Sequence, residues 1–106
     1  MVFKSLFLAH VPDADMEKHR CVIETSLYKL FVIIVRNQQQ AVSVAKNLLE
    51  EEGIQSILLC PGFTHADVAE IQEAVKDRAG VCVARGDSPS SKAALAAMEK
   101  AGWFKR

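Results

Sequence analysis

The chain has no excess of charge of either sign. Its 106 residues carry 13 basic and 13 acidic side chains, so the formal net charge near neutral pH is zero. Proteins that follow a nucleic-acid duplex, or that bind an anionic membrane surface, attract phosphates through a field of positive charge. We therefore expect no nucleic acid and no membrane among the partners of this protein.

Long apolar runs and a regular cysteine pattern are also missing. No segment approaches the roughly 20 consecutive apolar residues that a helix needs to cross a bilayer. The apolar start of the chain is short and is interrupted by Lys4 and Ser5, which favours a first strand over a signal peptide. The three cysteines are an odd number without regular spacing. They fit reduced thiols better than a disulfide framework, and we expect a cytoplasmic protein.

Signatures of metal, nucleotide and Schiff-base chemistry are absent. No pair of histidines or cysteines has the spacing of metal ligands, so we predict no metal site. The glycine turn near residue 62 lacks the lysine of a P-loop and the glycine spacing of a dinucleotide fingerprint. No strand end carries a lysine suited to a Schiff base. The sequence therefore leaves the cofactor unknown.

The sequence does have the composition of one globular domain over residues 1–106. Half of the residues are hydrophobic and a quarter are charged, which is enough to build a core without a metal or a disulfide. Apolar runs predict four strands, at Val2 to Ala9, Leu30 to Val35, Ile54 to Cys60 and Val81 to Ala84. The run from Leu30 has no polar position, which is typical of a strand covered on both faces.

Helical patterns separate these strands. Apolar residues recur at the three-four spacing between Asn37, a predicted N-cap, and Gly53, a predicted stop. A second helix is predicted from Thr64 to Arg78, and a third begins near Ser88, where the following proline suits the first turn.

The alternation of strands and helices predicts an α/β fold. Helical crossovers between strands produce a mainly parallel sheet of about four strands with helices on its faces. Weak alternation from Cys21 to Thr25 indicates a possible antiparallel edge strand, and residues 12–20 look like a turn with a short helix. Trp103 and Phe104 are expected to pack on the body of the protein or on a partner.

Chemistry-bearing residues follow the predicted strands at the edge where parallel sheets bind ligands. The strand ends carry His10, Arg36, the segment Cys60 to His65, and Arg85. Cys60 could act as a nucleophile with His65 or His10 as general base. The alternative is that Cys60 belongs to the core, since free cysteine is among the most buried residue types.

A small anion is the other ligand that this edge could bind. In that hypothesis Gly62 and Phe63 form a turn, Thr64 exposes the N–H groups of the second helix, and Arg85 clamps the anion. The alternative is that Thr64 is an ordinary N-cap paired with Asp67. Glu24 and Thr25 could face the same cleft from the edge strand, or they could lie on the surface.

Several segments together resemble a known family. Phe-Leu-Ala-His with Pro-Asp-Ala-Asp, then His-Arg and Ile-Glu-Thr, then Gly-Ile-Gln-Ser-Ile-Leu-Leu-Cys-Pro-Gly-Phe-Thr-His look like a family of small bacterial α/β domains of unknown function. The resemblance covers most of the chain up to residue 85 and implies a cytoplasmic bacterial protein without an assigned activity. It draws attention to nine residues: His10, Glu24, Thr25, Cys60, Gly62, Phe63, Thr64, His65 and Arg85.

Two classes of function follow from these observations. The first is a binding module that self-associates, as a homodimer, through residues 101–104 and the edge strand, and that holds a small anionic ligand at the strand ends. The second is an enzyme that uses Cys60 as nucleophile. We favour the binding module because catalysis needs a base oriented by a third group, and the sequence names none.

Overall fold

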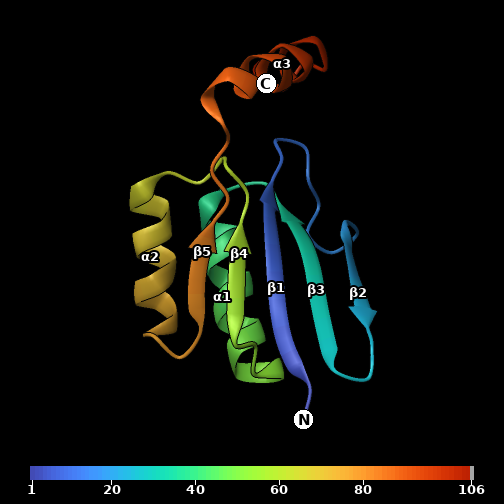
Figure 1. Ribbon diagram of the computed structural model, residues 1–106, viewed down its shortest axis with the longest axis vertical. Helices are drawn as coiled ribbons and strands as arrows, with labels where there is room; N and C mark the ends of the chain where they lie inside the picture. Colours follow the sequence, from blue (N-terminus) through green and yellow to red (C-terminus); the bar gives the residue numbers. More distant parts are fainter. Residues whose placement is uncertain (106) are drawn as a thin grey trace.

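A five-stranded mixed sheet forms the centre of the molecule. In the computed structural model, which describes residues 1–105, the strands lie in the order β2-β3-β1-β4-β5 (Figure 1). Only the β2–β3 pair is antiparallel. The predicted α/β fold with an antiparallel edge strand is confirmed. The elements are β1 (Phe3–His10), β2 (Arg20–Glu24), β3 (Tyr28–Val35), α1 (Gln38–Glu52), β4 (Ser56–Leu59), α2 (His65–Val75), β5 (Gly80–Val83) and α3 (Ser88–Lys100).

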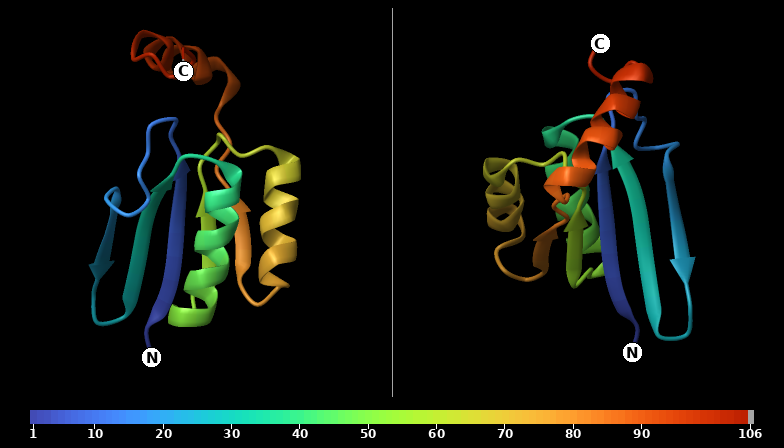
Figure 2. Two further views of the ribbon diagram at one scale, coloured as in Figure 1. Left: turned by 180° about the vertical axis from the view of Figure 1, so that it is seen from behind. Right: turned by 45° about the horizontal axis from the view of Figure 1, so that its top comes forward.

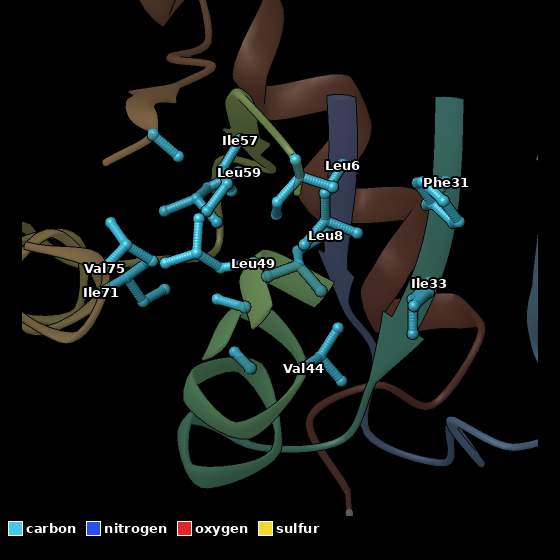
Figure 3. Packing of buried hydrophobic residues seen from close by; sticks show 14 of the residues in the cluster. Leu6, Leu8, Phe31, Ile33, Val44, Leu49, Ile57, Leu59, Ile71 and Val75 are labelled. Carbon is cyan, nitrogen blue, oxygen red and sulfur yellow. The ribbon is translucent and has the colours of Figure 1, made fainter. Parts of the chain in front are cut away.

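Helices α1 and α2 lie side by side on one face of the sheet (Figure 2). Figure 3 shows Val44 of α1 and Ile71 of α2 directed at the strands, where Leu8 and Ile57 meet them. The alternating burial of β3 follows from this arrangement, because only every second side chain points toward the helices. Cover on both faces of β3 was predicted, but within residues 1–105 only the helix side is covered.

The ends of α1 are set by the residues that the sequence predicts. The side chain of Asn37 accepts a hydrogen bond from the backbone N–H of Gln40 at 2.9 Å. Gly53 closes the helix with φ of 71°, a left-handed conformation that glycine adopts at low cost. Because α1 begins so soon after β3 ends, Arg36 is held at the carboxyl edge of the sheet.

Helix α2 ends earlier than its apolar pattern predicts. Its last residue is Val75, whereas the sequence indicated a helix to Arg78. Lys76 and Asp77 both adopt positive φ values, 51° and 62°. The left-handed residues break the helical repeat and turn the chain toward β5.

The segment between β1 and β2 contains turns and no helix, so the short helix predicted there is wrong. Asp15 makes most of the hydrogen bonds that hold this segment. Its carboxylate accepts the backbone N–H of Glu17, and its own N–H donates to Nδ1 of His19. The carbonyl oxygen of Asp15 also accepts the N–H groups of Lys18 and His19, at 3.0 and 2.7 Å, which closes one turn that does not continue as a helix. The turn anchors the loop that carries Val11 and Pro12.

The Asp15 turn predicts that the stability of this loop depends on pH. The pKa of the Asp15 carboxyl lies below its ordinary value of 3.8, first because the Glu17 N–H donates to it, and then because of the nearby Lys18 and His19. The ionised carboxylate therefore stabilises the turn above pH 3.8, and this contribution is lost as the pH falls through the lowered pKa. A carboxyl NMR titration should give a value below 3.8. An Asp15→Asn variant should lose the acid-dependent shifts of loop amides; shifts that persist would contradict this account.

Helix α3 stands beyond the carboxyl ends of the strands, away from both faces of the sheet (Figure 1). None of its residues is buried. The radius of gyration is 14.3 Å, against about 13 Å for a compact chain of this length. Trp103 is half-buried and Phe104 is 62% exposed. Residues 1–105 contain no helix with both the length and the apolar character that spanning a membrane requires.

Candidate ligand-binding pocket

The neighbouring strands β1 and β4 form a switch point in the sheet. The chain leaves β1 toward β3 and β2, whereas it leaves β4 toward α2 and β5 on the other side. Connections that diverge in this way open a crevice at the carboxyl ends of the strands, which is where open α/β sheets bind ligands. His10 at the end of β1 and Cys60 after β4 flank this crevice.

A cavity of about 840 Å³ lies at this crevice, between the strand ends and α3. Its volume falls within the range of small-molecule sites, about 300–1,000 Å³. Apolar residues form most of the wall, and a few polar side chains interrupt it, as is usual for such sites. The lining residues are Ala9, His10, Val11, Pro12, Arg36, Cys60, Pro61, Gly62, Gly86, Asp87, Ser90, Ser91, Ala94, Leu95, Met98, Trp103 and Phe104.

Cys60 and His10 are in contact on the wall of the cavity. The backbone N–H of His10 donates to Sγ of Cys60 at 3.3 Å, and Cys60 is half-buried. The His10 imidazole packs against the ring of Phe63, with 5.5 Å between centroids. Within residues 1–105 no hydrogen bond to the imidazole nitrogens orients it as a base. The structure thus brings these two predicted residues together. It gives the Cys60 thiol a hydrogen-bond donor, but it holds no base in position beside the thiol.

Gly62 lines the cavity next to this pair. A methyl group built on Gly62 would lie 3.6 Å from Sγ of Cys60 and 3.8 Å from Cβ of His10. These are ordinary van der Waals distances, so an alanine side chain fits at this position. Glycine is therefore not required here by the turn, and it leaves room on the cavity wall.

Phe63 and Thr64 hold the turn after β4 together. Phe63 is 1% exposed and belongs to the core. The Thr64 hydroxyl accepts the N–H of Asp67 at 3.1 Å, and Oδ2 of Asp67 accepts the N–H of Thr64 at 3.0 Å. This capping box is the structural alternative predicted for Thr64. It places the Asp67 carboxylate at the start of α2, where the small anionic ligand was predicted to bind.

Arg85 and His65 lie outside the cavity wall. Nη1 of Arg85 donates to the carbonyl oxygen of Pro61 at 3.3 Å, so the side chain reaches toward the β4–α2 turn. His65 is the first residue of α2 and is exposed. The structure therefore brings His10, Cys60 and Gly62 together at the cavity, and it leaves His65 and Arg85 beside it.

Glu24 and Thr25 lie at the opposite end of the sheet, so the expectation that they face the cleft is wrong. Glu24 pairs with Lys29 near the start of β3, whereas His10 pairs with Val35 at its end. Six residues of strand separate the two levels by about 20 Å. The Thr25 hydroxyl accepts backbone N–H groups of Leu27 and Tyr28 and shapes the β2–β3 turn.

The second wall of the cavity was not predicted. Ser90, Leu95, Met98 and Trp103 contribute from α3 and the residues after it. The sequence predicted the third helix and the packing of Trp103 and Phe104 on the body or on a partner, but it assigned no residue of this helix to a site. Arg36 was recognised as a strand-end residue and not as part of a site. No group of three His, Cys, Asp or Glu side chains in residues 1–105 could hold a metal ion.

A protein-family model matches most of the chain. The model of a family of unknown function, DUF6506, matches residues 3–99. The chain belongs to DUF6506. The matched residues include the β4–α2 turn and most of α3, so both walls of the cavity lie largely within the DUF6506 region. No curated protein and no solved structure shows a significant match to the chain.

Proposed function

We propose that this DUF6506 protein is a binding module whose pocket holds a small molecule with an apolar body and one anionic group. The observation that carries the proposal is the cavity of about 840 Å³ at the switch point between β1 and β4. Its apolar lining favours an aliphatic or aromatic body of the ligand.

Arg36 is the reason for proposing an anionic group on the ligand. Among residues 1–105, it is the arginine or lysine side chain that lines the cavity. Within residues 1–105 no carboxylate forms an ion pair with its guanidinium. A guanidinium binds carboxylate or phosphate oxygens through a planar pair of donors. We therefore assign anion recognition to Arg36 in place of Thr64 and Arg85, whose environments are filled by the capping box and by the Pro61 carbonyl.

The three cysteines support a cytoplasmic location. All three are free thiols, and Cys21 and Cys82 are exposed. Exposed thiols persist in a reducing compartment. We propose the cytosol as the place where this protein acts.

Decanoate and decanol are suitable probes, because they share an apolar chain and differ in charge. Trp103 is the single tryptophan of the protein and lies on the cavity wall, so its fluorescence reports binding there. We expect decanoate to change the Trp103 emission and to bind about fivefold more tightly than decanol, since an exposed ion pair contributes up to about 1 kcal/mol. Equal affinities, or no change in emission, would contradict the proposed ligand class.

An Arg36→Gln variant isolates the charge. We expect it to weaken decanoate binding about fivefold and to leave decanol binding unchanged. Arg78→Gln is the matched control, because Arg78 is exposed and pairs with Glu50 away from the cavity. An equal loss of decanoate affinity in both variants would show that Arg36 has no specific role.

The second candidate is an enzyme with Cys60 as nucleophile. It is favoured by the contact between Sγ and the His10 N–H on the cavity wall. The two candidates differ in what Cys60→Ser should change. A binding module keeps its affinity for decanoate after this change, whereas an enzyme of this kind loses covalent labelling of the pocket by iodoacetamide. Rapid labelling of Cys60 ahead of exposed Cys21 and Cys82 would favour the enzyme.

A further inference from the structure

The face of the sheet opposite α1 and α2 is uncharged across all five strands. The register of the sheet places one set of side chains on this face, which we call the open face. The open face contains Phe3, Ser5, Phe7, Ala9, Cys21, Ile23, Tyr28, Leu30, Val32, Ile34, Ser56, Leu58, Gly80 and Cys82. None of these residues carries a charge, although a quarter of the chain is charged.

Much of this surface is accessible in the single chain. Phe3 is 49% exposed, Ile23 is 57% exposed and Leu58 is 42% exposed. The front view in Figure 1 shows no helix over these strands. Monomeric proteins rarely expose contiguous apolar patches larger than a few hundred Å². Exposed apolar patches larger than this are typical of interaction sites.

We propose that the open face is covered by the open face of a second copy of this chain. In a twofold dimer each surface patch meets itself, so a charged patch would repel its own copy. The open face avoids this repulsion because it has no charge of either sign. Two sheets packed face to face, about 10 Å apart, would bury both sets of apolar side chains.

The area of the open face is sufficient for a modest dimer. Five strands at a spacing of about 4.8 Å are about 24 Å wide, and strands of this length average about 19 Å. Two such faces together have a flat area of about 900 Å². The uneven surface of the side chains adds to this area. This flat area lies below the roughly 1,200–2,000 Å² that stable specific interfaces bury, so we expect a weak dimer that dissociates at micromolar concentration.

The two outer cysteines report on this interface. Cys21 and Cys82 lie on opposite edges of the open face, in one row with Val32, Phe7 and Leu58. Both thiols are exposed in the single chain. The proposed dimer covers them, so their alkylation rates should fall as the protein concentration rises through the dissociation constant.

A lysine on the open face tests the interface by sedimentation. The unaltered protein should shift, with rising concentration, from 11.7 kDa toward twice that mass. Leu58→Lys and Ile23→Lys should each weaken dimerisation by on the order of a hundredfold, because like charges would face each other in the dimer. Val22→Lys is the control, because Val22 is 52% exposed on the same edge strand but pairs with Phe31 on the helix side.

The remaining outcomes would overturn the proposal. A protein that stays monomeric at all concentrations would overturn it. If Cys21 and Cys82 resisted alkylation in such a monomer, another segment of the same chain would cover the open face. A dimer weakened as much by Val22→Lys as by Leu58→Lys would place the interface elsewhere. Circular dichroism spectra of the variants should match the unaltered protein, and Ile23→Lys keeps the test valid if Leu58→Lys unfolds.

Discussion

Replacing Phe63 by alanine is expected to lower the free energy of unfolding by about 3–5 kcal/mol, the usual cost of removing a buried phenylalanine ring. Phe63 is 1% exposed and is the largest of the fully buried side chains. Its backbone N–H donates to the carbonyl of Cys60, and its ring meets the His10 imidazole. The ring thereby joins the core to the wall of the pocket.

Urea unfolding followed by circular dichroism measures this loss. Phe104→Ala is the matched control, because Phe104 is 62% exposed and its removal should cost less than about 0.5 kcal/mol. Domains of this kind have a total stability of about 5–15 kcal/mol, so the Phe63 variant should be close to unfolding at the low end of this range. Similar losses in both variants would contradict the assignment of Phe63 to the core.

Replacing Leu95 by glutamate is expected to weaken decanoate binding by about tenfold or more, because it removes apolar contact area and places a like charge beside the anion. Leu95 lies on α3 and lines the cavity, but it is 52% exposed. Its replacement should therefore leave the free energy of unfolding nearly unchanged. Weaker binding together with an unchanged free energy of unfolding would show that Leu95 belongs to the pocket wall and not to the core.

The matched control is Ala96→Glu on the same helix. Ala96 is exposed and does not line the cavity, so the control has the same added charge without contact with the ligand. Titration of Trp103 fluorescence measures both variants. If both bound decanoate as the unaltered protein does, α3 would have no part in the site.

The sequence was sufficient to predict the fold because local signals and apolar patterns agree. Asn37 and Gly53 bound α1 as predicted, and Thr64 is the N-cap of α2. The misses have local causes. The hydrogen bonds of Asp15 close one turn where a short helix was predicted, and Lys76 ends α2 in a left-handed conformation that no apolar pattern reveals.

The site was predicted only on its strand side. His10, Cys60 and Gly62 were recognised because strand ends in parallel sheets meet at one edge. Glu24 was placed wrongly because the direction of an antiparallel strand decides which end of the sheet its last residue reaches. The contribution of α3 depends on where four connecting residues direct the helix, which is a tertiary property without a local signal.

Chemical-shift mapping of backbone amides during a decanoate titration tests the central proposal most directly. The pocket predicts that the largest shifts lie at Ala9 to Pro12, at Cys60 to Gly62 and along α3 from Ser90 to Met98. Residues of the open face away from the pocket, such as Val32 and Leu58, should shift little at protein concentrations that maintain the dimer. Largest shifts on the open face, with none at Cys60 or Leu95, would contradict the assignment of the ligand to the pocket.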